Sequence, residues 1–154
     1  MSGFSCRPLS PDQAAAVYPL VREAIPGLGL RGWLRFARRA TAPRRALREG
    51  IMVVVRLPRA LPCGLFVYRR ESDLARGPVL VAEHFVAVDL LDPAPVMRAL
   101  VAELDALAQR LGCQAIRAMV LSDASLLASG LHAAGHRAEG EALWKDVKRP
   151  VSGR

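Results

Sequence analysis

The chain has 154 residues, of which 52% are hydrophobic, and this size and composition indicate one folded domain rather than a disordered chain. No apolar stretch approaches the roughly 20 residues that cross a bilayer, and the first residues lack the basic and then apolar pattern of a secretory signal. The formal net charge is +8, and the three cysteines form no CxxC pair, which argues against a disulfide framework. We therefore expect a cytoplasmic protein with no membrane partner.

Arginine carries almost all of the positive charge, since Lys145 and Lys148 are the only lysines. Arginine forks suit the binding of carboxylates and phosphates. The abundant Ala, Gly and Pro equally indicate the bacterial-like composition that a GC-rich genome produces. Both explanations remain open, because a charge excess by itself indicates weak association more than a site.

The first third of the chain predicts one strand and two helices. Phe4–Leu9 has the pattern of a short strand, and Ser10 followed by proline is a typical helix start. Apolar residues then recur at helical spacing until Pro26. A second helix carries Trp33 and further apolar residues as far as Ala40.

The middle of the chain predicts three strands. Ile51–Arg56 is a β-branched run that is typical of a buried strand, and Gly64–Arg70 follows it after a proline-bounded turn. These two segments therefore form a predicted hairpin. Val79–Val88 is the longest strand candidate.

The last third predicts a long helix within a β-α-β unit. Asp92–Leu111 has one apolar stripe at spacings of three and four, made of Val96, Leu100, Leu104, Leu107 and Leu111. Ala115–Leu121 is a predicted strand, and Ser122 begins a short helix that stops at Gly135. Ala138–Val147 is predicted to form one or two final strands.

This order predicts an α/β (α+β) fold, with a mixed, mostly antiparallel central sheet flanked by helices. We expect a single domain over residues 1–148 and a polar C-terminal tail over residues 149–154. No repeat or linker divides the chain.

The element order and three local segments resemble the GNAT superfamily of acyl-CoA N-acyltransferases over nearly the whole chain. Cys6–Asp12 resembles the family's opening strand and first helix cap, Ala108–Cys113 the helix end before its fifth strand, and Leu131–His136 a helix-to-strand turn. The resemblance implies transfer of an acetyl or acyl group from acyl-CoA to an amine of a small-molecule or peptide acceptor.

The family's pyrophosphate-binding loop, Arg/Gln-x-x-Gly-x-Gly, is replaced here by residues 92–97. Asp92 stands in place of the cation, and Pro95 and Met97 stand in place of the glycines. Pro93 and Pro95 each lack an N–H, so the loop loses donors that would hold a phosphate. Many family members also place a general-acid tyrosine where this chain has Leu131.

The resemblance implies a catalytic carboxylate on the fourth strand, at Glu83, which would take a proton from the acceptor amine. His84 is a second candidate base. The alternative for Glu83 is a surface ion pair with an arginine, and for His84 a hydrogen-bonded surface histidine. A regular strand would place Glu83, Phe85 and Ala87 on one face.

The resemblance also implies a binding path for the acyl-CoA. The main chain of Phe85, Val86, Ala87 and Val88 would meet the pantetheine arm. The start of the long helix, at Ala94, Val96, Met97 and Arg98, would meet the rest of the cofactor.

The acceptor would contact Trp33 and Arg35, within an arginine-rich segment that runs from Arg31 to Arg48. An acidic acceptor or a phosphate could dock on these arginines, and a solvated helix face is the alternative. Apart from Trp33 and Phe36 the segment lacks the aromatic residues on which a single strand stacks.

Three functions remain open on these residues. The first is the N-acyltransferase, the second is a catalytically degenerate GNAT-fold module for ligand binding or interaction, and the third, least favoured, is a basic nucleic-acid-binding protein. We expect no metal, because Gly135 separates His132 from His136 and no further ligand is evident. The assembly is left open, with a homodimer as one alternative.

Overall fold

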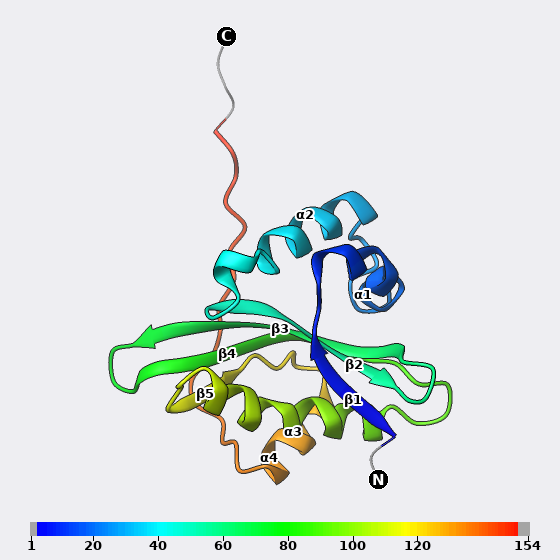
Figure 1. Cartoon of the computed structure of the whole chain (residues 1–154). Helices are drawn as coiled ribbons and strands as arrows, with labels where there is room; N and C mark the ends of the chain where they lie inside the picture. Colours follow the sequence, from blue (N-terminus) through cyan, green and yellow to red (C-terminus); the bar gives the residue numbers. More distant parts are fainter. Residues whose placement is uncertain (1–2, 151–154) are drawn as a thin grey trace.

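The computed structural model describes residues 3–150, and within this range five strands form one mixed sheet in the order β1-β2-β3-β4-β5 (Figure 1). In chain order the elements are β1 (Phe4–Pro8), η1 (Pro11–Val17), α1 (Tyr18–Ala24), α2 (Leu30–Ala40), η2 (Pro43–Arg45), β2 (Glu49–Arg56), β3 (Leu61–Asp73), β4 (Gly77–Ala87), α3 (Ala94–Arg110), β5 (Ala115–Ala118) and α4 (Ser125–Ala133). The prefix η marks a 3-10 helix.

Helices cover both faces of this sheet, with α1 and α2 on one face and α3 and α4 on the other (Figure 1). Strands β1 to β4 pair with one another antiparallel, whereas β5 runs parallel to β4. The parallel pair requires a crossover, which α3 supplies. The predicted fold class, a mixed and mostly antiparallel sheet flanked by helices, is confirmed.

The apolar stripe of the long helix packs on the sheet as predicted. Val96, Leu100 and Leu104 are fully buried and belong to one cluster with Phe66 and Leu80 of the sheet. At roughly 25 cal/mol per Å² of buried apolar surface, a stripe of this kind fixes the helix to the sheet.

Gly64 lets the first turn of α3 approach the sheet closely. A Cβ atom at this position would lie 2.7 Å from Val96 Cγ1 and 2.9 Å from the carbonyl oxygen of Val86. A side chain at this position would therefore push the N-terminus of α3 away from the sheet.

A second cluster fills the space under α1 and α2. Trp33 is 2% exposed, packs with Ala37 and with Ile51 of β2, and donates its indole N–H to the carbonyl oxygen of Ala14 at 2.7 Å. The helix after Ser10 begins as the 3-10 helix η1 and becomes α-helical only at Tyr18.

The C-terminal prediction is wrong. Residues 138–147 form no strand, and every residue from 137 to 150 is exposed. A strand needs a neighbouring edge for its main-chain groups, and in this structure the segment leaves the body of the domain (Figure 1). Strand β5 is also shorter than predicted and ends at Ala118.

Strand β4 carries a bulge that the sequence did not reveal. Its register against β3 shifts between the pairs Leu65↔Val86 and Val67↔Glu83, and His84 has a φ of 58°. The predicted alternation is therefore wrong, because a bulge turns the following side chains to the other face. Phe85 packs on the α3 side, as does Ala87, whereas Glu83 lies opposite Val67, which packs on the α1/α2 side.

Candidate functional site

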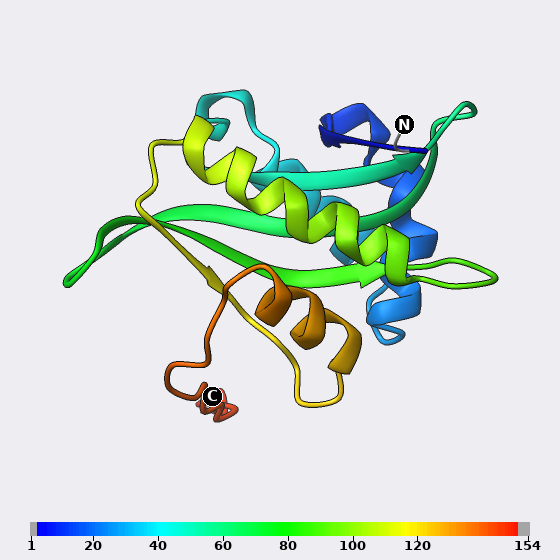
Figure 2. The same ribbon diagram turned by 90° about the horizontal axis from the view of Figure 1, so that it is seen from below.

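One edge of β4 is free beyond the point where β5 leaves it. The parallel ladder between β4 and β5 ends at the pair Ala82↔Ala118, although β4 continues to Ala87. The other edge of β4 stays paired with β3 up to the pair Gly64↔Ala87. Figure 2 shows β4 and the chain after β5 diverging. Within residues 3–150, the main chain of residues 83–87 has no strand partner on this side.

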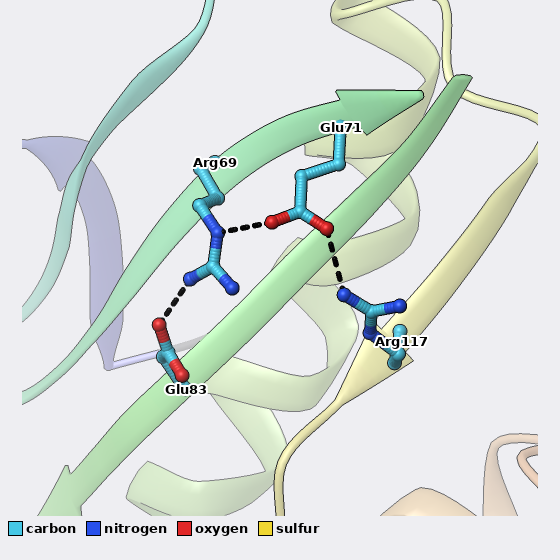
Figure 3. Close-up of polar contacts among 4 residues, drawn as sticks. All are labelled: Arg69, Glu71, Glu83 and Arg117. Carbon is cyan, nitrogen blue, oxygen red and sulfur yellow. Dashed lines mark hydrogen bonds and ion pairs between the residues drawn. The ribbon is translucent and has the colours of Figure 1, made fainter. Parts of the chain in front are cut away.

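Four charged side chains form a connected network on the α1/α2 face of the sheet, beside this edge (Figure 3). Arg69 of β3 forms an ion pair with Glu83 of β4, and its Nε donates to Glu71 at 2.6 Å. Arg117 of β5 donates to the second oxygen of Glu71 at 2.7 Å. Two arginines and two glutamates from neighbouring strands therefore alternate across the sheet.

The network holds Glu83 in place without burying it. Its side chain is 22% exposed, and Arg69 bridges it to Glu71. The hydrogen bond from Arg69 lowers the pKa of Glu71, with smaller contributions from the charges of Arg69 and Arg117. A fixed, solvent-reachable carboxylate of this kind can orient and deprotonate a bound amine.

His84 lies at the bulge and is exposed. Its left-handed backbone conformation is uncommon for a residue with a side chain. No hydrogen bond or ion pair within residues 3–150 involves its imidazole, so it differs from the hydrogen-bonded surface histidine that the sequence suggested as the alternative.

In the loop before α3, aspartate side chains bind the loop's own main-chain N–H groups. Asp89 Oδ1 accepts hydrogen bonds from the main-chain N–H groups of Leu91 at 2.8 Å and Asp92 at 3.3 Å. Asp92 Oδ1 accepts one from Ala94 at 2.9 Å. Asp89 also forms an ion pair with Arg56, which anchors the loop to β2.

This loop does not fit a pyrophosphate. Pro93 and Pro95 have no N–H, and the N–H groups of the three other residues between positions 91 and 95 already bind aspartate oxygens. Two carboxylates thus occupy the place where a dianion would need donors and positive charge. Helix α3 has Pro93 as its N-cap residue, and the carboxylate of Asp92, one residue earlier, binds the N–H of Ala94, the first residue of the helix.

The predicted cofactor residues divide into accessible and buried ones. Val96 is fully buried and Met97 is 9% exposed, so their side chains belong to the core, whereas Arg98 is exposed and Ala94 is half-buried. Phe85 is half-buried, with its ring centroid 5.3 Å from that of Phe66. Its half-buried neighbours Ala87 and Val88 and the buried Val86 complete the stretch. Of these residues, only the buried Val86, Val96 and Met97 offer a ligand almost no side-chain surface.

Trp33 and Arg35, the predicted acceptor residues, have opposite environments. Trp33 has no accessible surface for a substrate, because it is buried and its N–H is taken by Ala14. Arg35 is exposed and lines an open depression of about 460 Å³ on α2 with Arg31 and Arg38.

A second depression, of about 510 Å³, adjoins the charged network. Its lining consists of five arginines and one glutamate, namely Arg44, Arg45, Arg48, Glu49, Arg69 and Arg70. Arg69 belongs both to this lining and to the ion pair with Glu83, although Glu83 itself does not line the depression.

Sequence reasoning missed Arg69, Glu71, Arg117 and Asp89. The first three come together only through the strand register, which pairs Val81 with Arg69 on one side and with Arg117 on the other. Asp89 did have a local signal, because an aspartate shortly before an Asp-Pro pair is typical of a turn that binds its own backbone.

No protein-family model matches the sequence, and no curated protein matches it. Solved structures match it closely in shape. The aminoglycoside N-acetyltransferase AAC(6')-Iy, solved in complex with CoA, has a TM-score of 0.78 at 13% identity, covering 96% of this chain and 97% of the other. Glucosamine-6-phosphate N-acetyltransferase from Arabidopsis thaliana has a TM-score of 0.73 at 12% identity, with coverage of 94% and 99%.

A ribosomal-protein-alanine N-acetyltransferase from Brucella melitensis biovar Abortus 2308 has a TM-score of 0.72 at 10% identity, with coverage of 94% and 99%. These likenesses place the chain in the class of GNAT-fold proteins. The GNAT fold that the sequence segments suggested is therefore confirmed. Within residues 3–150, no helix is both long and apolar enough to span a membrane.

Proposed function

We propose that this chain transfers an acyl group from a thioester donor to an amine, and that the donor is held mainly by its pantetheine arm. The single observation that carries the proposal is the free edge of β4 next to the Glu83 carboxylate. The amides of a pantetheine arm can pair with main-chain groups of residues 83–87 as an added strand would.

The proposed acyl transfer requires one proton acceptor from the protein. The amine nitrogen bonds to the thioester carbonyl carbon, the C–S bond breaks, and the thiolate leaves. Glu83 takes the proton that the nitrogen loses, directly or through a water molecule. Leu131 is 4% exposed and has no proton to donate, so the thiolate takes its proton from solvent.

The acyl donor is not bound through its pyrophosphate. The loop with Asp89 and Asp92 offers no free donor between residues 91 and 95, so the nucleotide end of coenzyme A adds little binding energy. Acetyl-CoA and acetyl-pantetheine, which shares the arm but lacks the nucleotide, should therefore bind with similar affinity.

The acceptor class follows from the charge beside Glu83. The depression with Arg44, Arg48 and Arg69 favours an amine that carries a phosphate or a carboxylate. The amine would lie at Glu83 and the anion among the arginines.

The loop with Asp89 and Asp92, whose N–H groups are already bound, favours a second candidate function. This function is a module that binds a ligand or partner without catalysis. The two candidates are separated by measuring binding and turnover on the same sample. Thermal unfolding and calorimetry with acetyl-CoA, coenzyme A and acetyl-pantetheine report binding, and thiol release with a panel of phosphorylated and carboxylated amines reports turnover.

Similar stabilisation by both acetyl thioesters, together with thiol release, is the expected result. Binding without thiol release for any amine would support the non-catalytic module instead. An absence of stabilisation by every thioester would remove the acyl-transfer proposal.

A further inference from the structure

The segment between Glu23 and Glu49 carries most of the positive charge of the chain. It has no acidic residue and no lysine, and its seven arginines compare with a net charge of +8 for the whole sequence. The rest of the chain is therefore close to neutral. All seven side chains are exposed, namely Arg31, Arg35, Arg38, Arg39, Arg44, Arg45 and Arg48.

Four of these arginines share the outer side of α2, and we call this group the arginine face: Arg31, Arg35, Arg38 and Arg39. Residues three and four apart lie on the same side of a helix. The opposite side, with Trp33, Ala37 and Ala40, is buried against the domain. Helix α2 is the outer layer on its side of the sheet (Figure 1), so the arginine face is open to a large partner.

The protein does not neutralise the arginine face. Within residues 3–150, none of its four side chains takes part in a hydrogen bond or ion pair, and among the seven arginines only Arg45 has an acidic partner, Glu49. Like charges three and four residues apart repel one another on a helix. Arg31 also lies in the first turn, where the helix dipole disfavours a cation. An external anion would offset both effects.

The density of this charge favours a polymer of phosphates as the partner. Helix α2 has 11 residues and is therefore roughly 16 Å long. A nucleic-acid duplex carries roughly ten phosphates over that length, enough to meet all four arginines of the face at once. Each guanidinium can donate two parallel hydrogen bonds to one phosphate.

The apolar residues of α2 argue against an anionic membrane and against a single strand. A helix that lies in a membrane interface buries its apolar side in the lipid, whereas Trp33 and Ala37 are already buried in the protein core. A single strand stacks its bases on free aromatic rings. The ring of Phe36 instead packs on that of Trp33, with centroids 6.2 Å apart.

We propose that the arginine face of α2 binds the phosphate backbone of a nucleic-acid duplex without reading its sequence. Contacts with phosphates position a protein on a duplex but carry no sequence information. The inference does not depend on the proposed acyl transfer. The depression on α2 shares no lining residue with the one that contains Arg69, so the two proposed sites use different side chains.

The test is fluorescence anisotropy of short labelled DNA and RNA duplexes, titrated with the intact chain at several salt concentrations. Four phosphate contacts predict a slope of roughly −3 to −4 for log K against log salt, and an affinity roughly 100-fold lower at about 200 mM than at about 50 mM. Duplexes of unrelated sequence should bind equally. The DNA and RNA arms distinguish the two sources of the same backbone chemistry.

Charge removal at the arginine face should weaken this binding specifically. Arg35→Gln combined with Arg38→Gln should reduce the slope by about 2 and the affinity at low salt by at least about tenfold. The matched control, Arg59→Gln combined with Arg98→Gln, removes the same charge at exposed positions outside α2 and should leave the slope unchanged. The α2 variant should unfold at no lower temperature than the wild type, because it relieves repulsion.

Weaker duplex binding in the α2 variant alone supports the proposal. An absence of binding to both duplexes at about 50 mM salt, or an equal loss in the control variant, would overturn it. Polyglutamate and phosphatidylglycerol vesicles are two further arms of the titration. Stronger binding to either of them than to a duplex, at the same concentration of negative charge, would also overturn it and assign the arginine face to an acidic protein or a membrane.

Discussion

The Oδ1 atom of Asp92 accepts a hydrogen bond from the main-chain N–H of Ala94 at 2.9 Å, so a side chain fills a donor at the start of α3. Asp89 does the same for Leu91 and for Asp92 itself. The first N–H of this helix, that of Ala94, is therefore satisfied by the protein's own carboxylate, and Pro95 in the same turn has no N–H to offer an external anion.

Freeing main-chain N–H donors at the start of α3 should raise the affinity for the nucleotide part of acetyl-CoA. Asp92→Ala frees the N–H of Ala94 and removes a negative charge, and Pro95→Gly adds an N–H to the loop. The combined variant should bind acetyl-CoA at least about tenfold more tightly, with acetyl-pantetheine affinity unchanged, as measured by calorimetry. Loss of the hydrogen bond between Asp92 and Ala94 should cost about 1 kcal/mol of stability. Equal changes for both ligands would contradict this account of the loop.

Replacing the candidate base should affect turnover more than binding. Glu83→Gln keeps the size and the contact with Arg69 but cannot accept a proton, so acyl transfer should fall by about 100-fold or more. Donor affinity should change by less than a factor of about 3, because the donor is held by main chain. Glu71→Gln, in the same network, is the control and should retain most activity. Unchanged turnover in Glu83→Gln would exclude Glu83 from the mechanism.

The bulge makes a separate prediction for His84. Its φ of 58° is unfavourable for a residue with a Cβ atom, so His84→Gly should raise the free energy of unfolding by about 1 kcal/mol. Chemical denaturation measures this change. If His84 is not the base, turnover should persist in His84→Gly. A loss of turnover comparable to that of Glu83→Gln would identify His84 as the base.

The network should make stability depend on acid pH. The hydrogen bond from Arg69 lowers the pKa of Glu71 in the folded state, so the Glu71 carboxylate stabilises the fold at neutral pH. This contribution is lost as the pH falls from about 4.3, the ordinary value for glutamate, through the lower folded pKa. Urea unfolding at a series of acidic pH values should show a shallower decline for Glu71→Gln. Arg69→Met should make the acid decline of the free energy of unfolding similarly shallow. If the effects of the two substitutions on this decline simply add in the double variant, Arg69 and Glu71 do not act together.

The cysteines should differ in reactivity. Burial, aided by Glu103 and Cys63, raises the pKa of the Cys6 thiol to about 11, and burial also raises that of Cys63. Since the thiolate is the reactive form, both should alkylate slowly in the native protein near pH 8, as followed by mass spectrometry. Complete labelling in urea is the control. Rapid native labelling of Cys6 would show that its surroundings open in solution.

Local patterns in the sequence were enough for most of the fold. The apolar stripe of α3 and the β-branched run of β2 depend on residues close together in the chain, so the element order and the mixed sheet followed from patterns of this kind. The same patterns led to the GNAT resemblance, which the similarity in shape to solved acetyltransferases supports. The prediction of a strand at residues 138–147 was wrong, because a strand needs a partner edge that its own residues do not specify.

Glu83 and the altered loop could be named from the sequence, since each is a residue type at a position along one segment. What surrounds them was decided only by the tertiary structure. The bulge at His84 moved Glu83 to the opposite face from Phe85, and the strand register brought Arg69, Glu71 and Arg117 beside it. Register and bulges arise from contacts between residues far apart in the chain, and a single sequence carries no direct signal of those contacts.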